Sequence, residues 1–181
     1  MYLPDGRYTL LYINIMNRLR LLIGCVSIFV SVIASAQGRY SLRLMDEGNM
    51  VFFYPCKLAS LQKGRSLVYD MNYITGRDSV VVNMTFSAPC SDVETVKLMA
   101  GDSLYETTDF TVFYREREKK NIASRIHILC PKDIYEAFFR SDKPLVVEVT
   151  TKSCSVSRFS YKPSSWKKER AIVHEAIELA K

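Results

Sequence analysis

The sequence predicts a mainly β protein: an antiparallel β-sandwich or an open barrel with one C-terminal amphipathic α-helix, or an α+β fold if that helix packs on a single sheet. Three observations predict this class. Apolar and polar residues alternate with a period of two along most of the chain. Turns rich in Gly, Asp and Asn separate the alternating segments. The period becomes helical only after Pro163.

The alternating segments predict a series of short strands. They cover residues 40–44, 50–54, 67–73, 80–86, 93–99, 104–106, 110–114, 122–130, 145–149 and a last segment that ends at 161. The clearest hairpin is built around the Gly-containing turn at 75–78. A second hairpin is expected around a charged turn at 115–121.

Two segments have helical features. Asp133 is placed to cap a short helix that runs to Arg140 and ends before Pro144. Ser165 is the expected N-cap of the C-terminal helix. The apolar stripe of that helix, which should lie on the sheet, consists of Trp166, Val173, Ile177 and Ala180. The opposite, polar stripe consists of Lys167, Arg170, His174, Glu178 and Lys181.

The N-terminal region has the three parts of a secretory signal peptide. Arginines precede an uncharged apolar run over residues 21–33, and the small residues Ala-Ser-Ala follow it. The run is shorter than the roughly 20 apolar residues of a stable transmembrane helix. We therefore predict a signal region at 1–36, cleavage between Ala36 and Gln37, and a single β-rich domain at 37–181.

Alternative N-termini remain open. Translation from Met16 would already produce a well-formed signal. Residues 22–25, Leu-Ile-Gly-Cys, resemble the lipobox of bacterial lipoproteins, which implies lipidation of Cys25. The apolar run continues past this cysteine here, whereas it ends at the cysteine in that family. An uncleaved membrane anchor is the third alternative.

Four cysteines remain after cleavage and are candidates for disulfides: Cys56, Cys90, Cys130 and Cys154. An even number in an exported chain allows up to two bridges in three connectivities, among which the sequence does not choose. Four buried thiols are the alternative. The chain has no CxxC pair, which argues against a thioredoxin-like site or a zinc ribbon.

The charge pattern argues against a nucleic-acid partner. The formal net charge is +6, and removing residues 1–36 takes away three arginines and one aspartate. The remaining bias is mild, and export makes nucleic acid a less suitable partner still. The charged clusters at 115–120 and 166–170 mix both signs, as solvated segments do.

Sequence motifs for catalysis or metal binding are weak. His174 and Glu178 share a helical face, but the second histidine of a zinc motif is absent, so no metal site is predicted. His127 and Cys130 are three apart on a strand and therefore point to opposite faces. No cofactor motif is present. The candidate ligand-binding residues are Phe113, Arg125 and His127, whose aromatic ring and cationic donors suit a sugar acid or a peptide carboxylate.

These observations predict an exported domain of the periplasm or cell surface, in a Gram-negative bacterium, that acts as a non-enzymatic binding or assembly module. Its expected partner is a protein or a carbohydrate. Membrane contact is expected only through an uncleaved or lipidated N-terminus. Two alternatives are a small periplasmic hydrolase or isomerase whose site is discontinuous in sequence, and a membrane-anchored accessory domain.

Overall fold

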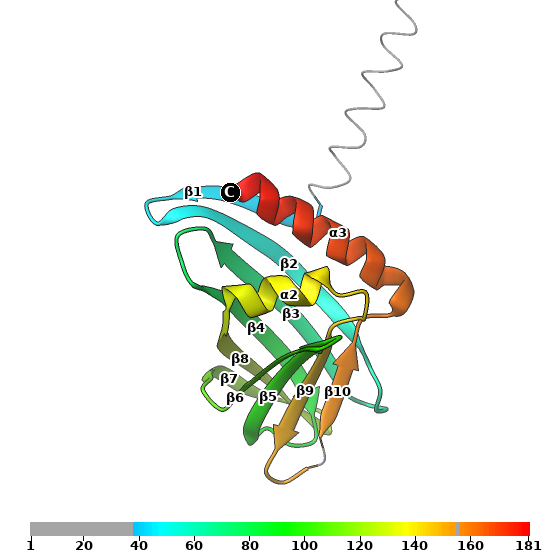
Figure 1. Ribbon diagram of the computed structural model, residues 1–181. Helices are drawn as coiled ribbons and strands as arrows, with labels where there is room; N and C mark the ends of the chain where they lie inside the picture. The colour runs from blue at the N-terminus through cyan, green and yellow to red at the C-terminus, as the bar shows by residue number, and fades with distance from the viewer. Residues whose placement is uncertain (1–37, 155) are drawn as a thin grey trace, which may run out of the picture. The chain divides into compact units, whose positions relative to one another are not determined.

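The fold is a curled antiparallel sheet that forms a half-barrel (Figure 1). The computed structural model describes residues 38–154 and 156–181, of which residues 39–181 belong to one compact unit. The strands are β1 (Tyr40–Met45), β2 (Gly48–Ser60), β3 (Ser66–Ile74), β4 (Ser79–Ala88), β5 (Val93–Ala100), β6 (Ser103–Thr107), β7 (Thr111–Glu118), β8 (Asn121–Pro131), β9 (Val146–Thr151) and β10 (Ser157–Ser160). The described helices are α2 (Lys132–Arg140) and α3 (Pro163–Ala180). The predicted mainly β class is confirmed, in its open-barrel form.

The long strand β2 curls the sheet. The order of neighbours is β6-β5-β9-β10-β2-β3-β4-β8-β7, and β1 pairs with the first half of β2. A bulge between Phe53 and Cys56 shifts the register of β2 against β3. Because a bulge increases local twist, β2 lies beside β1 before it and beside β10 after it. Pro55 is tolerated within the bulge, since it has no N–H for a regular ladder.

The two ends of the sheet approach each other without pairing. β7 pairs with β8 only as far as Thr111 opposite His127, so the last residues of β8 lack a strand on that side. Across this opening the hydroxyl of Tyr105 on β6 donates to the carbonyl of Leu129, at 2.5 Å. Among the described strands, β6 and β7 therefore each keep one free hydrogen-bonding edge.

Helix α3 packs through its predicted apolar stripe, which is buried. Trp166 lies with its ring centroid 5.2 Å from that of Phe139 and 5.3 Å from that of Tyr161. Its indole N–H donates to the carbonyl of Ser141 at 3.2 Å. Glu169 accepts a hydrogen bond from Arg39, which ties the helix to the start of β1. These contacts bring the end of the chain back onto its first strand.

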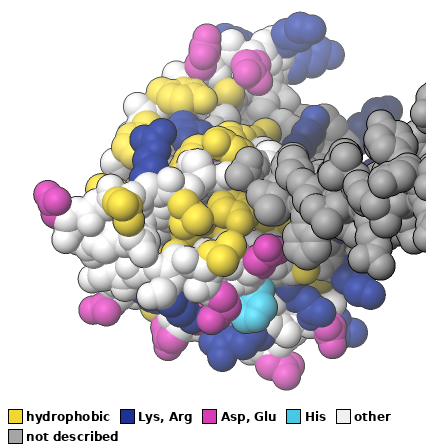
Figure 2. Space-filling view, turned by 90° about the horizontal axis from the view of Figure 1, so that it is seen from above, with side chains coloured by type: hydrophobic (Ala, Val, Ile, Leu, Met, Phe, Trp, Pro, Cys, Tyr) yellow, Lys and Arg dark blue, Asp and Glu magenta, His cyan; other side chains and the backbone are white. Residues whose placement is uncertain are grey.

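The end of the molecule that carries α3 shows hydrophobic side chains among charged ones (Figure 2). Leu42 and Leu44 on β1 and Leu179 on α3 are exposed, and they line a hollow of about 200 Å³. None of the described helices is both long enough and apolar enough to span a bilayer.

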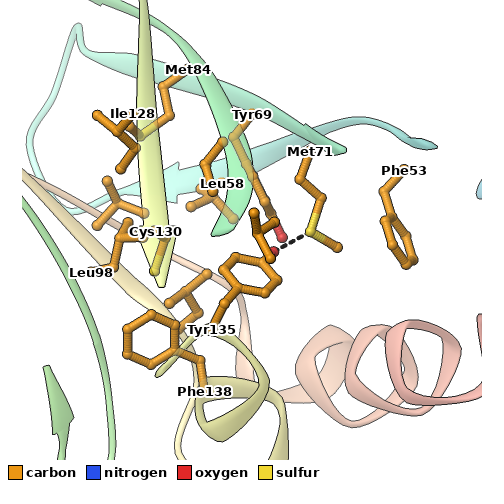
Figure 3. Packing of buried hydrophobic residues seen from close by; sticks show 14 of the residues in the cluster. Phe53, Leu58, Tyr69, Met71, Met84, Leu98, Ile128, Cys130, Tyr135 and Phe138 are labelled. Carbon is orange, nitrogen blue, oxygen red and sulfur yellow. Dashed lines mark hydrogen bonds between the residues drawn. The ribbon is translucent and has the colours of Figure 1, made fainter. Parts of the chain in front are cut away.

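Helix α2 lies against the concave side of the sheet. Figure 3 shows Tyr135 and Phe138 reaching from α2 toward the side chains of the surrounding strands, with Met71 joined to Tyr135 by the dashed line. Both aromatic residues are fully buried, and the Tyr135 hydroxyl donates to the sulfur of Met71. Packed side chains therefore fill the interior of the half-barrel where α2 lies against the sheet.

Both helix starts differ from the predictions. α3 begins at Pro163 with Lys162 as its N-cap, whereas Ser165 lies in the first turn and donates its hydroxyl to the Lys162 carbonyl. Proline suits the first helical position because its φ is already helical and its missing N–H is not needed there. α2 begins at Lys132, so Asp133 lies in the first turn and is not the cap.

The charged segment predicted as a turn is mostly strand. β7 continues to Glu118, and the turn itself consists of Lys119 and Lys120. Lys119 has a φ of 55°, as tight two-residue hairpin turns require. Because β7 is an edge strand exposed on both faces, charged residues replace the apolar alternation that marks the inner strands.

One disulfide joins Cys90, after β4, to Cys154, after β9, with the Cα atoms 6.0 Å apart. The other two candidate cysteines, Cys56 and Cys130, are free. Cys56 is half-buried at the bulge of β2, whereas Cys130 is fully buried. Burial raises the pKa of the Cys130 thiol to about 12, so this thiol is protonated at neutral pH.

We expect thiol labelling of the chain that starts at Gln37 to count two free cysteines. Native protein should react at Cys56 alone, because the reactive thiolate of Cys130 is suppressed by its raised pKa. Intact mass should show two labels after unfolding without reductant and four after reduction. Four labels without reductant would contradict the disulfide. The unlabelled mass of protein from its native host also tests cleavage after Ala36.

Candidate functional site

A row of polar side chains crosses the convex face of the sheet. Asp70 on β3 lies directly opposite Asn83 on β4, and Asn83 lies opposite His127 on β8. Thr85 and Arg125 form the next pair on the same face. Directly opposed residues share a face in an antiparallel sheet, and the residues between these point into the core. The period-two alternation of three strands thus builds one continuous polar row.

Hydrogen bonds hold this row in place. Arg125 donates from Nη2 to Asp70 Oδ2 at 2.7 Å and from Nη1 to Thr85 Oγ1 at 3.0 Å. Asn83 donates from Nδ2 to Asp70 Oδ1 at 2.8 Å. His127 Nδ1 lies 3.2 Å from Asn83 Oδ1. Because that amide oxygen is an acceptor, Nδ1 is assigned as the donor of this contact, which leaves Nε2 for a further hydrogen bond.

Burial differs along the row. Asp70 is 3% exposed and Asn83 is 8% exposed, whereas the side chain of Arg125 is 30% exposed. The carboxylate and the amide therefore form a supporting layer, and Arg125 and His127 lie above it. Both terminal atoms of the Asn83 amide thus form contacts below the surface, through Nδ2 to Asp70 and through Oδ1 to His127.

Phe113 presents an exposed ring beside this row. A bulge in β7 between Val112 and Tyr114 leaves Phe113 without a residue directly opposite it on β8. Its ring is 56% exposed, and its centroid lies 5.6 Å from that of His127 at an interplanar angle of 63°. Tyr114, opposite Arg125, is also exposed. We call Phe113, Arg125 and His127 the convex patch, together with the residues that support them from below, which are Asp70, Asn83 and Thr85.

The three residues singled out from the sequence thus lie on one surface, although Arg125 is already committed to Asp70 and Thr85. Sequence reasoning missed the supporting residues Asp70, Asn83 and Thr85. Their signal was present, because all three occupy polar positions in the clearest alternating hairpin. What the pattern lacked was the order of the strands, which alone brings Asp70 to Arg125.

A hollow lies between helices α2 and α3, apart from the convex patch. It measures about 170 Å³ and is lined by Glu136, Arg140, His174, Glu178 and Lys181, together with two apolar residues. Lys181 bonds Glu178 at 2.8 Å, and Glu136 accepts from the hydroxyl of Tyr73 at 2.7 Å. Its charges are thus largely satisfied internally. The described residues contain no cluster of three or more His, Cys, Asp or Glu that could hold a metal ion.

Three tyrosines with raised pKa values lie in the core and bond there to core partners. Burial raises the pKa of Tyr69, Tyr135 and Tyr161 above its ordinary value. The hydroxyls of Tyr69 and Tyr161 bond each other, and that of Tyr135 bonds Met71. Each hydroxyl therefore has a protein partner inside the packed interior, where its role is structural.

Comparison with known protein families, with curated proteins and with solved structures finds no significant match to this chain. The site therefore has to be understood from its own chemistry. The predicted cleavage residues Ala36 and Gln37 lie outside the described residues.

Proposed function

We propose that this protein is an exported binding module of the periplasm or cell surface that holds a neutral carbohydrate on the convex patch. One observation carries the proposal: the exposed ring of Phe113 lies against His127, beside a row of polar groups whose positions are set by hydrogen bonds. The apolar run at 21–33 and the small residues after it support export.

A sugar ring matches these groups because it has an apolar face and a polar edge. The face of Phe113 carries negative partial charge, which attracts the C–H groups on the apolar face of a pyranose. The remaining N–H groups of Arg125 and Nε2 of His127 suit hydroxyl groups at the edge. Because these side chains are already positioned, binding costs little ordering entropy.

The charge of the patch favours a neutral ligand. The sequence suggested a sugar acid or a peptide carboxylate, on the basis of the cationic Arg125. In the structure Asp70 neutralises that guanidinium at 2.7 Å. A ligand carboxylate would approach a pair that is already satisfied, and would lose its own hydration for little gain.

The alternatives rest on other features. A hydrolase or isomerase would be favoured by shifted titratable groups in a deep cleft, whereas Tyr69, Tyr135 and Tyr161, with raised pKa values, lie in the core. A membrane-anchored accessory domain would depend on the first 36 residues keeping their apolar run. Binding is the function that the exposed groups support best.

We expect neutral oligosaccharides to shift the amide resonances of β7 and β8 in a nuclear magnetic resonance titration. The probes are the tetrasaccharides of cellulose, chitin and starch, compared with an oligogalacturonate. Phe113→Ala should weaken binding about tenfold, because it removes the stacking surface. Leu61→Ala, which removes another exposed apolar side chain at 69% exposure, is the matched control and should bind normally. Failure of all three neutral probes, a preference for the acidic probe, or an unaffected Phe113→Ala variant would overturn the proposal.

A further inference from the structure

We propose that the free edge of β7 receives an extended acidic segment of a partner protein, which adds as a further strand and directs its acidic side chains toward Arg115 and Arg117. This proposal is independent of carbohydrate binding at the convex patch. It rests on the open edge, on the separation of charge between the two faces of β7, and on a basic hollow beside it.

The charges of β7 are sorted by sign. Arg115 lies opposite Ser124, and Ser124 lies opposite the core residue Phe86, so Arg115 is on the concave face. Arg117, two residues further along the strand, shares that face. On the convex face, Glu116 lies opposite Ala123 and belongs to the row that contains Ser87. Cations therefore follow one face of the edge strand and acids follow the other.

The concave cations border a hollow. It measures about 460 Å³, and its lining has three cations, Arg115, Arg117 and Lys120, against one acid, Glu116. Pro89 and Ser91 from the loop after β4, together with Asn121 and Ile122, complete the lining. In the described part of the chain, none of these three cations forms an ion pair with an acidic side chain.

Polar groups beside these cations also lack partners. The hydroxyl of Ser124, directly opposite Arg115, is buried and has no hydrogen-bond partner among the described residues. The backbone of β7 offers a free row of N–H and C=O groups along the same edge. An added strand would satisfy the backbone row, and its acidic side chains would compensate the unpaired cations.

A second copy of this chain does not fit the edge. An antiparallel pairing of two β7 strands that continues the sheet places residues of the same face opposite each other. Arginine would then oppose arginine, and glutamate would oppose glutamate, which is destabilising. Charges on an edge strand commonly prevent such self-association. The same arrangement accepts a foreign strand with acidic side chains on the concave face.

The test uses a fluorescent peptide of alternating Thr and Glu, compared with Thr-Gln and Thr-Lys peptides of equal length, in anisotropy titrations at low and high salt. The Glu peptide should bind about twofold to thirtyfold more tightly than the Gln peptide, as expected for two cross-strand charge pairs. Arg115→Gln/Arg117→Gln should abolish that preference. Lys167→Gln/Lys168→Gln removes the same charge from the exposed face of α3 and should preserve it.

Strand addition is tested separately from charge attraction. N-methylation of alternate residues removes backbone donors and should abolish binding when the methylated edge faces β7, so both phases of methylation are compared. Equal binding of Glu, Gln and Lys peptides, or an unaffected Arg115→Gln/Arg117→Gln variant, would overturn the assignment of charge. Full binding by both methylated peptides would overturn strand addition. A dimer of this chain that the double arginine variant dissociates would identify a second copy as the occupant and overturn the proposal.

Discussion

Replacing Trp166 with alanine is expected to lower the free energy of unfolding by about 3–5 kcal/mol. The indole is 2% exposed and packs against Phe139 of α2 and Tyr161 after β10. Its removal leaves a cavity between both helices and the sheet, and it also leaves the Ser141 carbonyl without the indole donor. Because α3 packs through few large side chains, this one loss should also loosen the helix.

Urea unfolding followed by circular dichroism measures the first effect, and hydrogen exchange of the α3 amides measures the second. Leu179→Ala is a suitable control, because it truncates an apolar residue of the same helix that is 61% exposed. That variant should stay within about 0.5 kcal/mol of the parent. Equal losses for the two variants would show that Trp166 does not anchor α3.

Replacing Asp70 with asparagine is expected to cost about 2–3 kcal/mol and to weaken carbohydrate binding. Asparagine keeps the shape but removes the charge that faces Arg125 at 2.7 Å. One of its two terminal atoms also becomes a donor, which would face a donor of Asn83 or Arg125. The expected cost is below that of breaking a fully buried ion pair, because the Arg125 side chain is 30% exposed.

A double-mutant cycle isolates this pair. Arg125→Gln alone should also destabilise the protein, and the double variant should recover about 1–2 kcal/mol of the summed losses, since neither charge is then left unpaired. The exposed pair of Arg77 and Glu47 serves as the comparison, with side chains 47% and 55% exposed. Its coupling should be about 0.5 kcal/mol or less. A similar coupling for both pairs would mean that burial of Asp70 adds nothing.

Local patterns predicted much of the fold because they depend on short-range geometry. Alternation identified the inner strands, since a strand packed on one face must place apolar residues at every second position. The same reasoning failed for β7 beyond Tyr114. At an edge exposed on both faces, no apolar face is required, so only the alternation of Arg and Glu remained as a signal.

In the candidate site, too, some contacts follow from local strand pairing and others depend on the order of distant strands. Phe113, Arg125 and His127 belong to a single hairpin, so their proximity follows from local pairing. Asp70 precedes Arg125 by 55 residues along the chain. Their contact exists because β4 lies between β3 and β8, an order that includes the long-range pairing of β4 with β8.

The sequence by itself determined which residues face inward and which face outward, because the alternation along a strand is a property of its backbone. Only the tertiary structure decided which distant segments lie side by side. The choice of Cys90 and Cys154 among three connectivities, the neutralisation of Arg125 and the open edge of β7 all depend on strand order. Contacts between distant segments reflect the packing of the entire core, and no local pattern encodes them.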